Sequence, residues 1–309
     1  MNYEKPNTLE KKRNILFTLI IPIYNLRGYI EECLDSIVPQ LRDDVEVICI
    51  NDGSTDGSGD LLSRYTKYPN FFVISTENRG QGAARNKGIK AAAGQYLLFI
   101  DGDDFIDREY LSEIRRLLER NSQHEDLEII LVGLRRFDDR TKKFLPDNPY
   151  YLTANYGVNG ICRPEALYDR LFEKFGPVFK IQKRDFILRH NLFYEEGVRF
   201  EDVVPHVKSL LSARKILVSD LAHYYYRFNR KGSTMNTSYD LKKLSEVFRF
   251  LLQVRQVLKE KGLFHRFKKS YLVFFENQID FHLQKVKPIF RPFVLMFSKI
   301  LLLVIRLAG

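Results

Sequence analysis

Four carboxylates follow the apolar run YLLFI, at Asp101, Asp103, Asp104 and Asp107. Crowded carboxylates repel one another unless a cation lies among them or a helix N-terminus takes up their charge. Asp107 is the expected N-cap of the next helix, a position that favours aspartate. Asp101 and Asp103 have no such explanation, and hard cations such as Mg²⁺ or Mn²⁺ bind carboxylates together with phosphate oxygens. This carboxylate segment, residues 101–107, therefore favours a metal site for a phosphate-bearing ligand.

A second acidic pair, Glu201 and Asp202, precedes an expected helix that includes Pro205. One of these carboxylates can serve as a general base that removes the proton from an attacking hydroxyl group. Two acids at a helix N-terminus also stabilise the helix through its dipole, with no chemistry involved. The spacing by itself does not choose between the two interpretations.

Two loops have residue types that suit a nucleotide. In residues 51–58, NDGSTDGS, Asp52 directly follows a strand and can bind ribose hydroxyls, whereas Asp56 is explained as a helix N-cap. The glycines of residues 78–88, NRGQGAARNKG, mimic a dinucleotide fingerprint, but they lack its third glycine and follow the third strand. A nicotinamide site is therefore rejected. Arg85 in this loop can either reach a diphosphate or lie on the helix surface.

A basic turn in residues 224–235, YYYRFNRKGSTM, is a third candidate for phosphate binding. Arg227, Arg230 and Ser233 flank its glycine. Such a turn can close over a diphosphate with backbone and side-chain donors. The alternative is a basic turn exposed to solvent.

The elements that must position these residues alternate between strands and helices. Buried strands are expected at 17–23, 45–50, 71–75, 95–100 and 127–133. Helices are expected at 28–41, 57–67, 81–92 and 108–120. The alternation predicts an α/β fold with a mainly parallel, Rossmann-like sheet and helices on both faces. Ligands bind at the carboxyl ends of such strands, which is where the polar loops and the carboxylate segment fall.

The second half of the chain alternates less regularly. Residues 135–143 predict an exposed hairpin, and residues 163–213 look helical with breaks. Two further strands are expected at 215–220 and 223–228, followed by a long basic amphipathic helix at 239–261.

Composition bounds the partners. The 309 residues are 45% hydrophobic and have a formal net charge of +10, which indicates a globular protein with an anionic partner. The three cysteines lack metal-ligand spacing and are expected to be free thiols. Basic residues concentrate late in the chain and no recognition motif occurs, so nucleic acid is not an expected partner.

The last segment, residues 288–309, is strongly apolar but is interrupted by Lys299 and Arg306. Its uninterrupted apolar run is shorter than the roughly 20 residues that a spanning helix needs. The prolines at 288 and 292 separate it from any helix upstream. An amphipathic helix at a membrane surface is expected, and a terminal helix packed on the protein is the alternative.

Residues 17–135 resemble the nucleotide-binding half of the family 2 glycosyltransferases of GT-A fold, through FTLIIPIYN, VEVICINDGSTDGS and ENRGQGAARNKGIKAAAGQYLLFIDGDD. The resemblance continues more loosely to about residue 236, through GVRFEDVVP and HYYYRFNRKGSTM. It implies inverting transfer of a sugar from a nucleotide-sugar, usually UDP-linked, to an acceptor hydroxyl. It also implies a GT-A domain at 15–236, with a nucleotide-binding half at 15–135 and an acceptor half at 136–236. A helical extension at 237–287 and the membrane-associating segment at 288–309 would follow.

The resemblance also implies roles for individual residues. Asp202 would be the base and Glu201 its orienting or acceptor-binding partner, while Asp103 would ligate Mg²⁺ or Mn²⁺. The nucleotide-sugar site would comprise Pro22, Tyr24, Asn25, Asp52, Asn78, Gly80, Arg85, Asn86, Asp101, Arg227 and Ser233. The acceptor would be a glycan or lipid-linked glycan, with the enzyme on the inner face of the cell membrane.

Two other interpretations have to be weighed. A sugar-1-phosphate nucleotidyltransferase would share the fold class, but it needs a Gly-rich, Arg-containing loop after the first strand, where this chain has PIYNLRGY. A non-catalytic membrane-associated binding protein would have no need of Asp103 or Asp202, which are both present.

Overall fold

The computed structural model of the chain describes residues 14–146, 157–173, 175–232 and 241–307. Within these residues, eight strands form one sheet in the order β3-β2-β1-β4-β10-β6-β11-β9. The four strands at one side, β3 (Phe71–Thr76), β2 (Val45–Asp52), β1 (Phe17–Ile23) and β4 (Tyr96–Phe99), all run parallel. Strands β1, β2 and β4 are buried along nearly their whole length, which confirms the prediction of strands covered on both faces. Strand β3, at the edge of the sheet, is buried only at Phe71 and is otherwise partly exposed.

The other side of the sheet is mixed. Strand β10 (Lys180–Lys183) lies antiparallel between β4 and β6 (Leu127–Leu131), while β11 (Lys215–Val218) runs parallel to β6. Strand β9 (Gly160–Cys162) is antiparallel at the edge. Neither β9 nor β10 was expected. The four residues of β10, KIQK, have no strong strand pattern, so only pairing with its two neighbours makes them a strand.

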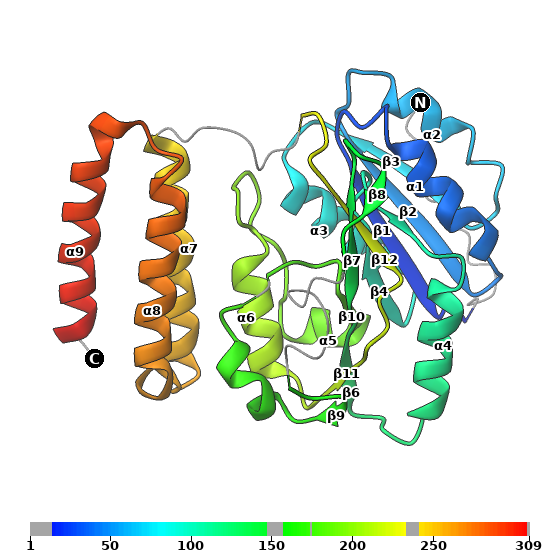
Figure 1. Cartoon of the computed structure of the whole chain (residues 1–309). Coiled ribbons are helices and arrows are strands. Elements are labelled where there is room, and N and C mark those ends of the chain that lie inside the picture. The colour runs from blue at the N-terminus through cyan, green and yellow to red at the C-terminus, as the bar shows by residue number, and fades with distance from the viewer. Residues whose placement is uncertain (1–13, 147–156, 174, 233–240, 308–309) are drawn as a thin grey trace.

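Helices cover both faces of the large sheet (Figure 1). Helix α3 (Gln81–Ala91) packs against β1 and β2 on the same side as α5 (Arg184–Arg189) and α6 (Val203–Ser212). Helices α1 (Ile30–Ile37), α2 (Ser58–Ser63) and α4 (Tyr110–Arg120) lie on the other side. The expected helices are thus present, with their ends at most four residues inside the predicted bounds. The breaks in 163–213 include the short 3₁₀ helix Pro164–Arg170.

A smaller sheet supports the carboxylate segment. Within the described residues it has four strands in the order β5-β12-β7-β8. Strands β7 (Leu134–Asp138) and β8 (Lys143–Phe144) form the predicted exposed hairpin. Strand β12 (Tyr224–Phe228) joins β7 to β5 (Phe105–Ile106), which belongs to the carboxylate segment itself.

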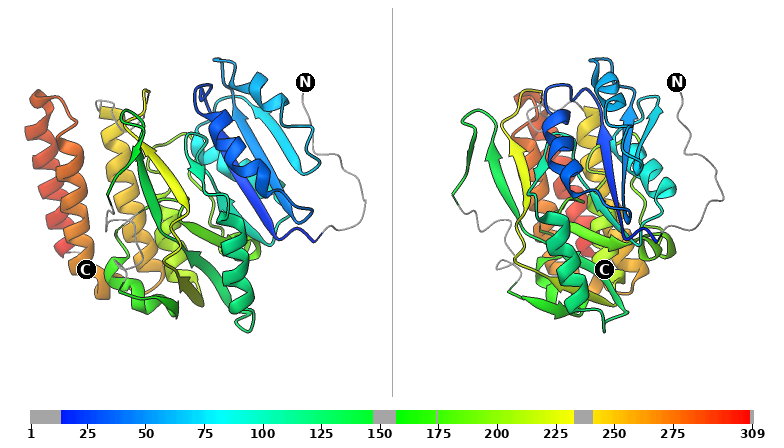
Figure 2. Two further views of the ribbon diagram at one scale, coloured as in Figure 1. Left: turned by 45° about the vertical axis from the view of Figure 1, so that its right-hand side comes forward. Right: turned by 90° about the vertical axis from the view of Figure 1, so that its right-hand side faces the viewer.

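Two C-terminal helices lie in the expected helical extension at 237–287, and a third lies in the expected membrane-associating segment at 288–309. Helix α7 (Leu241–Glu260) packs on α6, α8 (Phe264–Leu283) packs on α7, and α9 (Arg291–Leu307) packs on α8. Figure 1 shows α9 as the element farthest from the large sheet, and in the left view of Figure 2 the C-terminal helices lie on the side of the molecule opposite β2 and β3. The stretch Pro288–Arg306 is, by length and composition, apolar enough to cross a membrane, and 22% of its most apolar window is buried.

Candidate active site

The side chain of Arg85 joins two acidic parts of the chain. Arg85 lies in the second turn of α3 and is only 2% exposed. Its Nη2 donates to Asp101 Oδ1 at 2.9 Å, and its Nη1 donates to Glu201 Oε1 at 2.5 Å. The guanidinium also lies over the ring of Tyr194, 5.4 Å from the centroid. One buried cation therefore holds the carboxylate segment against the acidic pair.

The charges around Arg85 keep it protonated. Burial by itself lowers the pKa of the guanidinium, but Asp101 and Glu201 raise it, and the net pKa lies above the ordinary value. The sequence left open a diphosphate contact or a helix-surface position. The structure places the guanidinium inside the protein, between the two carboxylates.

Residues 193–200, the segment that leads to the acidic pair, are hydrogen-bonded to α3. Asn86 donates from Nδ2 to the carbonyl oxygen of Tyr194 at 2.8 Å, and its Oδ1 accepts the N–H of Tyr194 at 2.9 Å. Gly82 allows the close approach, because a Cβ atom there would lie 2.4 Å from the carbonyl oxygen of Glu195. Asn86 was expected near the nucleotide; in the structure its amide joins α3 to the acceptor half.

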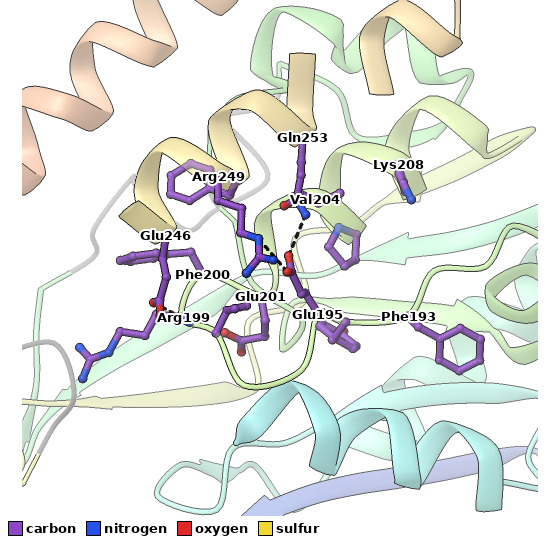
Figure 3. A pocket seen from close by; sticks show the side chains of 14 residues that line it. Phe193, Glu195, Arg199, Phe200, Glu201, Val204, Lys208, Glu246, Arg249 and Gln253 are labelled. Carbon is purple, nitrogen blue, oxygen red and sulfur yellow. Dashed lines mark hydrogen bonds and ion pairs between the residues drawn. The ribbon is translucent and has the colours of Figure 1, made fainter. Parts of the chain in front are cut away.

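Helix α7 holds the same segment from its other side (Figure 3). Glu195 pairs with Arg249 at 3.1 Å and accepts a hydrogen bond from Gln253 at 2.8 Å. Glu246 accepts the backbone N–H of Arg199 at 3.1 Å. The helical extension is therefore part of the support of the acidic pair.

A cavity of about 180 Å³ remains between α7, α6 and this segment. Its lining combines aromatic rings with charged groups, including Phe193, Phe200, Phe250, Glu201 and Lys208. Phe200 has a φ of 59°, so the backbone turns sharply just before the acidic pair. Glu201 thus has one oxygen on Arg85 and also forms part of the cavity wall.

Strand β12 donates hydrogen bonds to carboxylates of the carboxylate segment. Asp104 is buried and accepts hydrogen bonds from Tyr224 Oη at 2.6 Å and from the N–H of Arg227 at 2.7 Å. Burial, followed by the charges of Asp103 and Asp101, raises the pKa of Asp104 well above its ordinary value.

Asp107 differs slightly from its expected role as N-cap. Helix α4 begins at Tyr110 with Glu109 as its N-cap, and Asp107 Oδ1 accepts the N–H of Glu109 at 2.9 Å. Tyr225 Oη donates to its other oxygen at 2.9 Å. These contacts lower the pKa of Asp107, and the hydrogen bond from the N–H of Glu109 has the largest effect.

Arg227 lies in the interior, 3% exposed. It donates to Asp139 Oδ1 at 2.7 Å, to Glu32 Oε2 at 2.6 Å and to the carbonyl oxygen of Asp103 at 2.7 Å. Arg227 was expected to contact a diphosphate. In the structure its guanidinium contacts α1 and the small sheet. Ser233, its expected companion, lies outside the described residues.

Asp103, the expected metal ligand, forms an ion pair with Arg230. Burial and the charge of Asp101 raise the pKa of Asp103, while Arg230 opposes them. Among the described residues, no three His, Cys, Asp or Glu side chains are grouped to hold a metal ion. Mg²⁺ commonly takes one or two carboxylates and leaves its other positions to water and substrate phosphates. Asp103 fits such an ion once Arg230 moves away.

The loops expected to bind the nucleotide meet at the carboxyl ends of β1 to β3. Asp52 is buried, and its carboxylate accepts the N–H of Gly80 at 2.8 Å and of Arg79 at 3.0 Å. Asn25 has a φ of 53°, and its Oδ1 accepts the N–H of Thr55 at 2.8 Å. Asp52 therefore orders the loop before α3. Tyr24 and Asn78 are exposed nearby, and Pro22 lies in β1.

The acidic pair does not cap the helix that follows it. Asp202 is the N-cap residue of α6, but its side chain makes no capping hydrogen bond. Burial raises the pKa of both Glu201 and Asp202. The charges of Arg85 and Lys180 act against burial at Asp202. Asp202 therefore does not cap α6 through its side chain, although both acids lie at the N-terminus of this helix, where the helix dipole favours negative charge.

Three kinds of supporting residue were not expected from the sequence. They are Lys180 in the unexpected strand β10, Tyr224 in β12 and the polar face of α7. The sequence contained a signal for two of these, because residues 223–228 were expected to form a strand and residues 239–261 a basic amphipathic helix. Lys180 becomes recognisable only through the strands that pair beside β10.

The fold and this site define a GT-A class of transferase, in which parallel strand ends and a carboxylate segment meet. The family described as Glycosyl transferase family 2 matches residues 18–174, about half of the chain. The chain belongs to glycosyltransferase family 2, as its motifs predicted. The sugar-1-phosphate nucleotidyltransferase alternative is thereby set aside.

Several named relatives are similar over most of this chain. The uncharacterized glycosyltransferase EpsJ of Bacillus subtilis is 32% identical over 71% of this chain and 63% of its own length. The poly(ribitol-phosphate) beta-glucosyltransferase of Bacillus spizizenii is 32% identical over 72% of this chain and 34% of its own length. The chain thus spans less than two thirds of either protein.

A solved structure shares the fold. Residues 1–349 of Staphylococcus aureus TarS, in complex with UDP-GlcNAc, superimpose with a TM-score of 0.65 and 21% identity. The match covers 92% of this chain and 87% of that chain.

Replacing Arg85 by Met is expected to lower the free energy of unfolding by about 3–5 kcal/mol, because two partly buried carboxylates lose their shared cation. Urea denaturation followed by circular dichroism measures this change. The control is Arg79→Met, which removes an exposed ion pair with Glu196 and should cost less than about 1 kcal/mol. Equal losses in the two variants would show that the buried network contributes nothing special.

Proposed function

We propose that this chain transfers a sugar, with inversion at C1, from a UDP-linked nucleotide-sugar to an acceptor hydroxyl. The acceptor class would be a glycan or lipid-linked glycan in polysaccharide biosynthesis. The observation that carries the proposal is the network in which Arg85 joins Asp101, on the nucleotide side, to Glu201, on the acceptor side. Such a network keeps a donor site and a base at a constant separation.

The donor is proposed to bind at the carboxyl ends of β1 to β4. The loops ordered by Asp52 and Asn25 would surround the base and ribose, with Asp101 toward the ribose. The similarity to a TarS structure that contains UDP-GlcNAc supports a UDP-linked donor. The relatives named as poly(ribitol-phosphate) glycosyltransferases support a polymer as the acceptor.

Asp202 is proposed as the general base. It would accept the hydroxyl proton of the acceptor as the acceptor oxygen bonds to C1 and the nucleotide diphosphate leaves from the opposite face. Its raised pKa brings it closer to neutral pH, where a base of this kind is most effective. Glu201, held by Arg85, would orient the acceptor.

Asp103 is proposed to hold Mg²⁺ or Mn²⁺ against the diphosphate. When bound, the ion would supply positive charge for the departing diphosphate. Arg230, which pairs with Asp103, would have to leave this carboxylate first. It would then be free to contact a phosphate oxygen itself.

Asp202→Asn is expected to lower turnover by about 10²–10⁴-fold, because the amide cannot accept the proton. UDP release from the nucleotide-sugar measures turnover, and calorimetry should give an unchanged affinity for UDP. Wild-type activity should fall as the pH drops through the raised pKa of Asp202, since only the carboxylate acts as base. Glu196→Gln, on the same segment, is the control and should change neither quantity. Weaker UDP binding with normal turnover would refute the assignment of Asp202.

Asp103→Asn is expected to abolish metal-dependent transfer, because the ion loses its proposed protein ligand. The readout that does not need turnover is UDP affinity with and without Mn²⁺. Wild type should bind UDP more tightly with Mn²⁺, and the variant should bind equally in both conditions. Asp107→Asn, in the same segment, should retain the Mn²⁺ effect. Full wild-type activity in chelator would exclude the proposed metal.

We further propose that residues 288–309 attach the protein to the inner face of the cell membrane, through the helical extension at 237–287 that adjoins the catalytic unit at 15–236. One face of α9 packs on α8 through Val294 and Ile305. The opposite face is apolar and exposed, with Phe293, Met296, Ile300, Leu303 and Val304.

The charges of α9 support a surface position, although the stretch Pro288–Arg306 is long and apolar enough to cross a membrane. Arg306 pairs with Glu276 of α8 at 3.0 Å, and Arg291 donates to the backbone of Val286 at 3.1 Å. These two cations fix the helix to the protein, while the apolar face is left for lipid.

The triple variant Phe293→Glu, Ile300→Glu, Leu303→Glu is expected to abolish sedimentation with liposomes of anionic phospholipid, because charges replace the exposed apolar face. The control places Glu at Leu188 and Leu252, which are exposed apolar residues elsewhere, and should still sediment. Two outcomes contradict the proposal. One is unchanged sedimentation of the triple variant. The other is a C-terminus that protease reaches only from the far side of the vesicle.

A further inference from the structure

Lys180 is a buried lysine whose charge acts on Asp202 of the acidic pair. It is 4% exposed, at the start of β10, where its backbone pairs with Leu131 of β6. A buried ammonium is costly unless neighbouring groups compensate its charge. Its Nζ lies 3.0 Å from Nδ1 of His206, which is also buried.

His206 stands one helical turn after Asp202. The N–H of His206 donates to the carbonyl oxygen of Asp202 at 3.0 Å, and side chains four residues apart share one face of a helix. The contact with His206 therefore holds the ammonium of Lys180 on the face of α6 that also presents Asp202. The charge of Lys180 accordingly lowers the pKa of the Asp202 carboxyl.

His206 is suited to hold Lys180 without competing for the carboxylate. Its ring lies among those of Phe175 and Phe179, at centroid distances of 5.1 and 6.1 Å. Burial, and then the charge of Lys180, puts the pKa of His206 well below its ordinary value. The ring is therefore neutral, and Nδ1 accepts the hydrogen bond. Within the described residues its Nε2 has no hydrogen-bond partner.

The charged groups around Asp202 come from four directions. Arg85 of α3 and Lys180 of β10 favour the ionised carboxylate, and Asp101 after β4 and the adjacent Glu201 oppose it. Arg85 already serves Asp101 and Glu201 with both terminal nitrogens. Lys180 is not paired with other carboxylates in this way, because its hydrogen-bond partner is the neutral ring of His206.

We propose that Lys180 is a positioning residue for Asp202, an ammonium that His206 holds near the carboxylate so that Asp202 stays ionised and ready to accept the acceptor's proton. The proposal rests on the assignment of Asp202 as the base. Burial lowers the pKa of Lys180 itself to about 7, with Asp202 raising it and Arg85 lowering it. The ammonium and the carboxylate are therefore both charged at pH values above the pKa of Asp202 and below about 7, and they influence each other most strongly there.

Lys180→Met removes the charge and keeps a side chain of similar length. Without the ammonium the pKa of Asp202 should rise by about 1–3 units, the usual effect of losing an opposite charge nearby. The measurement uses the full chain labelled with ¹³C at the aspartate carboxyls, with the Asp202 signal identified by its loss in Asp202→Asn. The acid limb of the pH profile for UDP release should move upward by the same amount.

Two further variants separate the charge effect from a general disturbance. Lys180→Arg keeps the charge and should leave the Asp202 titration close to wild type. Lys183→Met removes the next lysine of the same strand, whose Nζ donates to the carbonyl oxygen of Glu125, and should have no effect. Lys180→Gln, which retains a donor for His206, serves as the charge-free variant if the Met variant does not fold, as judged by circular dichroism.

An Asp202 signal that titrates at the same pH in wild type and in the charge-free variant would overturn the proposal. The same is true if Lys183→Met has an equal effect. The failure of the proposed function looks different. In that case the Asp202 titration would follow the charge at position 180, but Asp202→Asn would retain normal turnover.

Discussion

A buried guanidinium is stable only when carboxylates compensate its charge. In this protein the two carboxylates that pair with Arg85 determine how the two halves of the chain meet. These partners of Arg85 lie 16 and 116 residues away in sequence. Removing either one would leave a charge inside the protein without compensation, which is among the most destabilising changes a fold can suffer. The carboxylate segment and the acidic pair are consequently held at one separation, the property that a two-substrate site needs.

A second constraint acts on the carboxylate segment itself. Asp104 is buried beside Asp103, and its burial is tolerated because Tyr224 and the backbone N–H of Arg227 donate hydrogen bonds to it. The small sheet therefore stabilises the carboxylate segment, since its strand β12 supplies those donors. Arg227 extends the same support to α1, so that the carboxylate segment is braced from two layers. Asp103 is left with Arg230 alone in the ion pairs of the described residues, which makes it the carboxylate most readily freed for a ligand.

The outer helices divide two tasks. Helix α7 fastens Glu195 and the backbone at Arg199, and so supports the backbone turn at Phe200. Helix α9 makes no such contribution, and its apolar outer face faces solvent in the described structure. Helix α7 thus contacts the segment that precedes the acidic pair, and it is largely buried on the side that meets α6 and α8. Helix α9, in contrast, presents an exposed apolar surface.

The sequence by itself determined the parallel half of the large sheet, because runs such as FTLIIPI and VEVICI are apolar on both faces and are read without knowledge of their neighbours. It also determined the family, whose motifs are contiguous, and it located the acidic pair. The tertiary structure alone decided that Arg85 lies between carboxylates, that Arg227 is interior and that KIQK forms a strand carrying Lys180. These are contacts between residues far apart in sequence. The charge or burial of such a side chain depends on which partner the fold brings beside it, and no local pattern encodes that partner.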